Sequence, residues 1–205
     1  MPIKKFTHLV PLTKEYAYNL MNMILILYAE HGMNNSTFST LVVGSAYDNP
    51  IPAGIVAGIL SLKGNRYGEI NIKVINFLTN MPDNENEAYQ FLLNHLQKRI
   101  EFPGVGHRIY RAPDPRFKIM YPYFLRIYRP SIHEKKMKIY ISFVEKYLSS
   151  KGVYPNVGLL SGYLLNYLSI PTSYFALIFL VSRLTGWLTH LWEYGALGGS
   201  IVSSS

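Results

Sequence analysis

The chain has 205 residues, of which 49% are apolar and only 16% are charged, so its composition excludes an intrinsically disordered protein. It contains no cysteine, which excludes disulfide bonds and thiolate metal sites. The formal net charge of +8 favours anionic partners. The charged fraction lies below the roughly 25% of typical soluble domains, which indicates that another subunit covers part of the surface.

The sequence predicts helices along nearly its whole length, with no alternating strand pattern and no internal repeat. Thr13 is typical of a helix N-cap, and Gly32 is typical of a helix end. The small residues at 53–54 and 57–58 are spaced for close contact with another helix. The predicted helices cover residues 13–31, 35–47, 51–62, 67–80, 85–100, 115–128, 132–149, 157–167 and 172–194.

Residues 157–192 are apolar enough that a membrane span has to be weighed. Their only charged side chain is Arg183, but the longest wholly apolar run, 174–181, is far shorter than the roughly 20 residues that cross a bilayer. We therefore expect two buried helices and no transmembrane span. The first residues lack a signal-peptide core, so we expect a cytoplasmic protein. The small, polar residues 195–205 predict a flexible tail.

The segment GVGHRIYRAPDPR, residues 104–116, carries the strongest signal for a binding site. Gly104 and Gly106 allow the backbone to approach a ligand closely, and two prolines stiffen the return of the chain. One histidine and three arginines can face a carboxylate or a phosphate, whose geometry matches the guanidinium fork. A basic surface loop is the alternative. Basic residues also collect over residues 98–138, which would suit a ligand with several phosphates such as CoA.

Four segments together resemble the citrate synthase family. GVGHRIYRAPDPR resembles that family's GFGHRVYK…DPR, and YAEHGMNNSTF (28–38) resembles HADHELNASTF. YPNVGLLSG (154–162) resembles YPNVDFYSG, and SRLTGWLTHLWE (182–193) resembles SRVAGWLAHWLE. The four lie in the family's order over about residues 20–195, so the chain is identified as a member that corresponds to the family's C-terminal half.

The resemblance implies an all-α, multi-helical fold in which a small domain is flanked by parts of a large domain. We expect partial large-domain helices over residues 1–63 and the small domain, which holds CoA and oxaloacetate in the family, over 64–155. Residues 156–194 are expected to return to the large domain, ahead of the tail at 195–205.

The family condenses acetyl-CoA with oxaloacetate, and the resemblance assigns three chemical roles in that reaction. His107 matches the histidine that donates to the ketone of oxaloacetate. Tyr67 stands in place of the histidine of GPLHGGAN, which donates to the thioester carbonyl. Gly158 stands in place of the aspartate that removes a proton from the acetyl group, and glycine has no side chain to accept one. The resemblance therefore implies weak or no activity for this chain alone.

The resemblance also assigns ligand-binding residues. His31, Arg116 and Arg183 match positions that hold oxaloacetate, and Arg111 matches a contact to a CoA phosphate. Arg183 needs an anionic partner in its apolar surroundings, and a salt bridge to Glu30 or Glu193 competes with a bound carboxylate. No chelating pair appears among the six histidines, so we expect no metal and no permanently bound cofactor, with an acyl-CoA as the co-substrate.

Three hypotheses remain open from the sequence. The chain is a citrate-synthase-like homologue that binds a dicarboxylate and serves as a non-catalytic subunit beside a longer paralogue, or as a ligand sensor. Alternatively, it is an active enzyme that condenses an acyl-CoA with a 2-oxoacid and takes its base from a partner subunit. The third hypothesis is a basic protein that binds membranes or nucleic acid non-specifically, although no specific nucleic-acid motif is present. The first two imply a homo- or hetero-oligomer.

Overall fold

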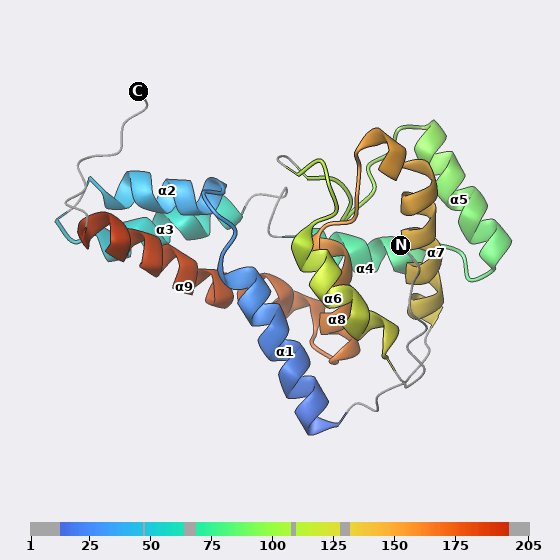
Figure 1. The fold of residues 1–205 in the computed structure, drawn as a ribbon, viewed down its shortest axis with the longest axis horizontal. Helices are drawn as coiled ribbons and strands as arrows, with labels where there is room; N and C mark the ends of the chain where they lie inside the picture. Colours follow the sequence, from blue (N-terminus) through green and yellow to red (C-terminus); the bar gives the residue numbers. More distant parts are fainter. Residues whose placement is uncertain (1–12, 47, 64–68, 108–109, 128–131, 197–205) are drawn as a thin grey trace. The chain divides into compact units, whose positions relative to one another are not determined.

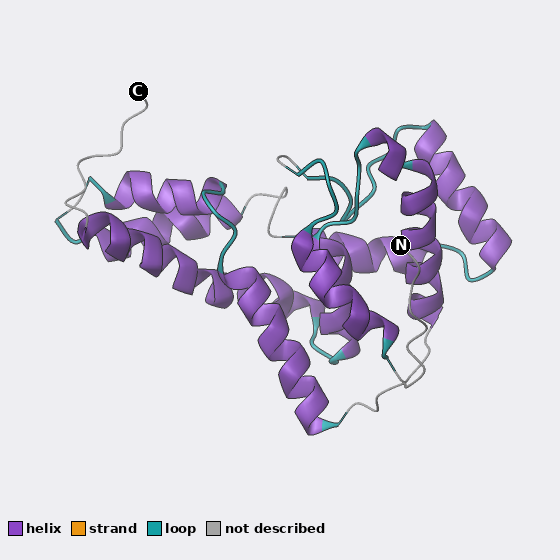
Figure 2. Cartoon of the chain, in the orientation of Figure 1, coloured by secondary structure: helices purple, strands orange, loops and turns teal. Residues whose placement is uncertain are grey.

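The computed structural model describes residues 13–46, 48–63, 69–107, 110–127 and 132–196. Every named element within these ranges is helical, and no strand occurs among them, which confirms the predicted all-α fold (Figure 1, Figure 2). The α-helices are α1 (Lys14–Ala29), α2 (Asn35–Gly44), α3 (Pro50–Leu62), α4 (Ile70–Asn80), α5 (Glu85–Gln97), α6 (Pro115–Leu125), α7 (Ile132–Tyr147), α8 (Val157–Tyr167) and α9 (Phe175–Ala196). Two short 3₁₀ turns, η1 (Ser149–Lys151) and η2 (Thr172–Tyr174), complete the set.

Five of the described helices, α1, α2, α5, α6 and α8, begin at side chains that accept hydrogen bonds from the first backbone N–H groups. Thr13 Oγ1 accepts from Tyr16 N at 3.1 Å, which confirms the predicted cap of α1. Asn34, Asn84 and Asn156 cap α2, α5 and α8 in the same way, and Asp114 caps α6. These caps explain why most helix starts lie within a few residues of their predicted positions.

The chain divides into two compact units, each of which is described by itself. Unit 1 comprises residues 1–23 and 70–172, and unit 2 comprises 24–69 and 173–205. The predicted small-domain and large-domain boundaries concern the family's domains and stay a prediction.

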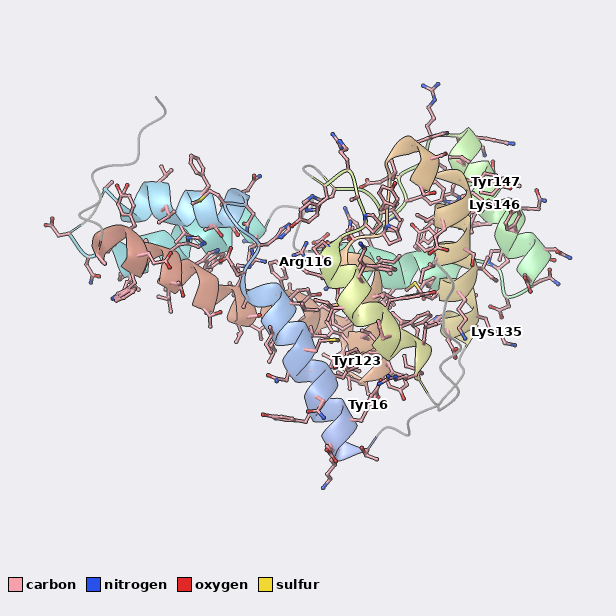
Figure 3. All side chains as sticks on the ribbon, viewed as in Figure 1. Tyr16, Arg116, Tyr123, Lys135, Lys146 and Tyr147 are labelled. Carbon is pink, nitrogen blue, oxygen red and sulfur yellow. The ribbon has the colours of Figure 1, made fainter. Side chains whose placement is uncertain are left out.

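Unit 1 is held together by an aromatic core and by close helix pairs. Tyr140 on α7 is fully buried and donates to the carbonyl oxygen of Pro103 at 2.9 Å. Its ring lies 4.9 Å from the ring of Phe77 on α4. The start of α1 joins the same unit, because Tyr16 Oη donates to the Tyr123 carbonyl of α6 at 3.2 Å (Figure 3). Burial and the charge environment raise the pKa of Tyr16 to about 12.

Unit 2 is built from α2, α3 and α9, which lie side by side (Figure 1). A Cβ added at Gly58 of α3 would lie 2.6 Å from Thr40 Oγ1 of α2 and 2.8 Å from the ring of Trp187 on α9. The close helix contact predicted from the small residues of α3 is therefore confirmed. Trp187 is fully buried and donates to Ser36 Oγ at 3.2 Å.

Helix α9, together with the turn before it, is long and apolar enough to cross a membrane by length and composition (172–196). This is weak evidence for a span, because the core helix of a globular protein passes the same test. Arg183, in the middle of α9, is buried and donates from Nε to the Tyr28 carbonyl at 2.7 Å. Only 33% of the apolar window of this helix is buried, however, so the expectation of two buried helices holds for α8 and is wrong for most of α9.

Candidate functional site

The loop before α6 is tied to the chain segment before α8. Gly106 N donates to the Tyr154 carbonyl at 2.7 Å, and Asn156 N donates to the Gly104 carbonyl at 2.9 Å. Asn156 Nδ2 adds a hydrogen bond of 2.8 Å to the Gly106 carbonyl. Two loops that are 50 positions apart in sequence are therefore joined at the start of α8. We call these joined segments, residues 104–107 and 154–156, the platform.

Gly104 allows a close backbone approach within the chain itself. Its φ of +76° favours glycine, and a Cβ there would lie 2.7 Å from Leu159 Cα. The backbone approach that this glycine allows is therefore to the first turn of α8. The expected approach of this loop to a ligand stays a prediction.

His107 is half-buried on this platform and has a defined tautomer. Its ring stacks on Tyr110 at a centroid distance of 4.4 Å, and Nδ1 accepts a hydrogen bond of 3.0 Å from Tyr110 N. Because an accepting nitrogen carries no proton, the neutral imidazole bears its proton on Nε2. Burial lowers the pKa of His107, the charge of Arg116 lowers it further, and Asp114 opposes both. At neutral pH His107 is thus a neutral donor through Nε2, the state needed to polarise a ketone oxygen.

Asp114 organises the site, although the sequence analysis did not single it out. Its side chain is almost fully buried, and its two oxygens accept from Arg116 N, Nε and Nη2 at 2.9, 3.1 and 2.9 Å. Oδ2 also accepts from Val157 N at 3.1 Å, which links the start of α6 to the start of α8. Burial raises the pKa of Asp114, but the hydrogen bonds and charge of Arg116 and the Val157 N–H outweigh it, so the pKa lies below its usual value. An aspartate before proline with an arginine two residues later was the available signal.

Arg116, predicted to bind a carboxylate ligand, lies at the N-terminal end of α6 (Figure 3). Its salt bridge to Asp114 orients the guanidinium. Its Nε and Nη2 donate to the two oxygens of Asp114. Arg111 lies exposed on the same loop and donates from Nη1 to the His107 carbonyl at 3.3 Å.

Gly158 lies in the first turn of α8 and is buried. A Cβ added there would lie 2.8 Å from Cγ2 and 3.0 Å from Cγ1 of Ile70, the first residue of α4. The space where an aspartate side chain would begin is therefore filled by a branched apolar side chain. Tyr67, expected to donate to a thioester carbonyl, lies outside the described residues.

His31 and Arg183 belong to unit 2. His31 follows the end of α1, and its backbone N donates to Glu30 Oε1 at 2.7 Å. Arg183 contacts the Tyr28 carbonyl, and its guanidinium lies 5.1 Å from the centre of the Phe179 ring. Glu30, one of the two acids considered as partners of Arg183, accepts from His190 Nε2 at 3.1 Å. The roles of His31 and Arg183 in ligand binding stay predictions.

The basic run at residues 133–138 is partly neutralised within unit 1. Lys136 is buried and pairs with Asp83 at 2.8 Å, and Lys138 pairs with Glu134. Lys135 is exposed on α7 (Figure 3). Fewer cations of this run are therefore available to a phosphate ligand than the sequence suggests.

Comparison with known proteins gives one consistent result. The family model described as "Citrate synthase, C-terminal domain" matches residues 3–202. The chain is 33% identical over 178 residues to a citrate synthase of Synechocystis sp., a match that covers 85% of this chain and 44% of that protein.

Solved structures agree with this result. The citrate synthase of Thermotoga maritima matches with a TM-score of 0.81 and 27% identity, over 92% of this chain and 52% of that one. The Thermoplasma acidophilum enzyme, solved as a ternary complex with carboxymethyl coenzyme A and oxaloacetate, matches with a TM-score of 0.77 and 28% identity over 94% and 52%. The chain spans about half the length of each protein it matches here.

Proposed function

The chain belongs to the citrate synthase family, and on that premise we propose that it is a non-catalytic relative that binds a 2-oxo dicarboxylate such as oxaloacetate. In this proposal the chain does not by itself condense that ligand with acetyl-CoA. Three groups are needed for the condensation: a donor to the ketone, a donor to the thioester carbonyl, and a base that takes a proton from the methyl group.

The observation that carries the proposal is the contact between Gly158 and Ile70. In the family motif GPLHGGAN, an alanine stands where this chain has Ile70, and an aspartate stands where it has Gly158. The family thus pairs a small alanine with a larger aspartate, whereas this chain pairs the large Ile70 with the small Gly158. With Ile70 Cγ2 only 2.8 Å from the position of a Cβ on Gly158, a carboxylate at this position meets a steric and apolar barrier. Loss of a positioned base commonly costs about 10²- to 10⁴-fold in rate.

The ligand-binding part of the proposal rests on His107 and Arg116. Nε2 of His107 is a neutral donor suited to a ketone oxygen, and Arg116 is held in place by Asp114. A 2-oxo dicarboxylate presents a ketone and a carboxylate to such a pair. His31 and Arg183, which match dicarboxylate-binding positions of the family, are proposed as dicarboxylate-binding residues of unit 2.

The remaining proposals follow from the family and from the sequence. An acyl-CoA is the proposed second ligand, with Arg111 contacting a phosphate, and no cofactor is permanently bound. We also propose a cytoplasmic protein that works in a homo- or hetero-oligomer, for example beside a full-length paralogue.

The second candidate is an active enzyme that condenses an acyl-CoA with a 2-oxoacid and is completed by a partner subunit. The TM-score of 0.81 to the Thermotoga maritima citrate synthase favours it, because the chain shares part of the fold of that protein. A partner's base would have to reach the methyl group without occupying the space that Ile70 fills. For this reason the non-catalytic function is preferred.

Calorimetric titration of the purified chain with oxaloacetate tests the binding function. We expect saturable binding that weakens about tenfold or more in Arg116→Lys, because lysine keeps the charge but loses the planar fork. The exposed Lys135→Ala is the matched control and should bind like the wild type. Absence of binding, or equal binding in Arg116→Lys, contradicts the proposal. Thiol release from acetyl-CoA by the same preparation, if lost in His107→Ala, would favour the second candidate.

A further inference from the structure

Two phenols and one ammonium group meet at the surface of unit 1, where α5 packs against α7. Tyr89 belongs to α5, whereas Lys146 and Tyr147 form the C-terminal end of α7 and are labelled in Figure 3. The Oη atoms of Tyr89 and Tyr147 lie 2.5 Å apart, and Lys146 Nζ donates to Tyr89 Oη at 3.1 Å. We call these three side chains the tyrosine–lysine cluster. None of them belongs to the platform or matches a site residue of the family.

The oxygen of Tyr89 is placed to carry a negative charge. Once Tyr89 has lost its proton, its oxygen can accept from the Tyr147 hydroxyl and from the Lys146 ammonium at the same time. The hydrogen bond with Tyr147 lowers the pKa of Tyr89, burial opposes this effect, and Lys146 lowers the pKa further. Tyr89 therefore carries more phenolate at a given pH than an ordinary tyrosine, and the phenolate is the form that attacks an electrophile.

Lys146 is the second nucleophile of the cluster. Its side chain is exposed, and Nζ lies 5.6 Å from the centre of the Tyr89 ring and 5.2 Å from that of Tyr147. The hydrogen bonds with Tyr89 and Tyr147 raise the pKa of Lys146, so the amine stays protonated beside the phenolate. An ester on Tyr89 carries no charge, so its formation releases this hold on the proton. The amine then lies beside an ester formed on the oxygen that it already contacts.

We propose that the tyrosine–lysine cluster accepts acyl groups from activated acyl donors, with Tyr89 as the first acceptor and Lys146 as the final one. In the first step the Tyr89 phenolate attacks the acyl carbon, a C–O bond forms, and the leaving group of the donor departs with its electron pair. In the second step the neutral Lys146 amine attacks the ester, and a C–N bond forms. The Tyr89 phenolate leaves and takes up the proton that the amine gives up, so the product is an amide at Lys146.

The donor is defined by its chemistry as an acyl carbonyl bonded to a good leaving group. Acyl thioesters of CoA and acyl phosphates both fit, and both carry phosphate groups that the cation of Lys146 attracts. The inference is independent of the proposed function, because it uses no residue of the platform and no bound dicarboxylate.

The test compares Lys146 with Lys135, which is exposed on the same helix (Figure 3). The full chain is incubated in mildly alkaline buffer with acetyl phosphate or, in a parallel arm, with acetyl-CoA. Mass spectrometry of peptides follows the acetylation of each lysine over time. We expect Lys146 to react about tenfold faster than Lys135, because transfer from an adjacent ester replaces a bimolecular encounter. A faster reaction in one arm alone supports the proposal and identifies the donor.

Conservative variants separate the two steps. Tyr89→Phe keeps the ring but removes the first nucleophile, so the rate at Lys146 should fall to within about threefold of that at Lys135. Lys146→Arg keeps the cation but removes the final acceptor, so an acetyl ester that hydroxylamine releases should accumulate on Tyr89. Tyr18→Phe on α1, where Tyr18 is 71% exposed, is the matched control and should leave the rate at Lys146 unchanged.

Three outcomes overturn the inference. One is a rate at Lys146 within about threefold of that at Lys135 in both arms. Another is a rate at Lys146 that is unchanged or higher in Tyr89→Phe, since the amine would then react directly with the donor. The third is the absence of an ester on Tyr89 in Lys146→Arg. An oxaloacetate titration on the same samples reports separately on the proposed function, so the two proposals can fail independently.

Discussion

Units 1 and 2 belong to one chain, yet they bury their apolar side chains to very different extents. Of the 29 buried apolar residues among those described, only Ile24, Tyr28, Leu41, Phe175, Trp187 and Leu191 belong to unit 2. In unit 1 the rings of Phe77, Phe102 and Phe143 join with Tyr140 into one aromatic cluster, because Phe102 contacts both Tyr140 and Phe143. Burial of apolar area is the main favourable term in folding, so unit 1 has most of what stabilises this chain.

This difference in apolar burial accompanies a difference in where the two units place their charged residues. Unit 1 alternates buried apolar residues with charges, and three of the four ion pairs among the described residues lie in it. Unit 2 keeps a small core around Trp187 and leaves its outer helices apolar. Unit 1 thus has most of the apolar burial among the described residues, whereas unit 2 keeps most of the large exposed apolar side chains.

The largest expected effect is that of Trp187→Ala. Trp187 is fully buried and bonded to Ser36, and replacing a buried tryptophan by alanine typically costs about 3–5 kcal/mol. Because unit 2 has little other core, we expect it to unfold. Hydrogen exchange followed by mass spectrometry should show lost protection in α2, α3 and α9, with α7 and α8 unchanged.

Phe143→Ala is the matched control for that comparison. Phe143 is fully buried in unit 1, so its truncation should lower protection in α5 and α7 first. If either variant lowers protection equally across both units, the chain folds as one cooperative body and the comparison fails.

The second prediction concerns Asp114→Ala, which removes a buried carboxylate and leaves Arg116 without it. Breaking such a pair costs about 3 kcal/mol, and the cap of α6 is lost as well. Urea unfolding of unit 1 should show this loss as a lower free energy of unfolding. The control is Glu30→Gln at the exposed pair with His190, which should lower the free energy of unfolding by less than about 1 kcal/mol. Equal losses in the two variants would show that Asp114 does not organise the site.

The third prediction is that Gly158→Asp destabilises the chain and gains no activity. Overpacking typically costs about 1–3 kcal/mol, and here the new Cβ would lie 2.8 Å from Ile70 Cγ2. Adding Ile70→Ala should recover most of the lost thermal stability. A stable single variant would refute the claim that Ile70 closes this position.

The smallest effect is the response of unit 1 to acid. Burial lowers the pKa of His107 below its ordinary value, so the unfolded chain takes up a proton more readily. The neutral ring contributes its full stability above about pH 6.5, the pKa of His107 in the unfolded chain. This contribution is lost as the pH falls through the lower pKa of His107 in the folded chain. Asp114, whose pKa is also lowered, adds a loss below about pH 4.

Urea unfolding from pH 7.5 to 5 measures this response. His107→Gln should flatten part of the decline, and the rest is assigned to His133, whose pKa is lowered by burial and by Lys136. Stability that rises on acidification, or a decline identical in His107→Gln, would contradict the environment described for His107.

Helices and caps were the part of this fold that the sequence could predict. The range 157–167 is reproduced by α8, because Asn156 caps its start and an apolar run follows. The first helix ends at Ala29, two residues earlier than predicted, because Glu30 accepts from the His31 N–H. Local signals of this kind depend only on residues a few positions apart.

The site depended on contacts that no local pattern contains. Ile70 and Gly158 are 88 positions apart, so the sequence showed the missing aspartate but not the side chain that fills its place. The local Asp-Pro-Arg pattern could suggest the pairing of Asp114 with Arg116, but the bond from Val157 N to Asp114 spans 43 positions and has no local signal. Similarly, Lys136 counted as a free cation in the sequence until the structure placed it against Asp83.

The most direct test of the account is exchange of the acetyl-CoA methyl protons in D₂O, followed by NMR with oxaloacetate and the purified chain present. Proton removal by a positioned base is the step that the proposed function denies to this chain, because Ile70 lies where a side chain on residue 158 would begin. We predict exchange and citrate formation no faster than in buffer. Exchange catalysed by the chain and abolished in His107→Ala would show that a base does reach the methyl group, and would contradict the account.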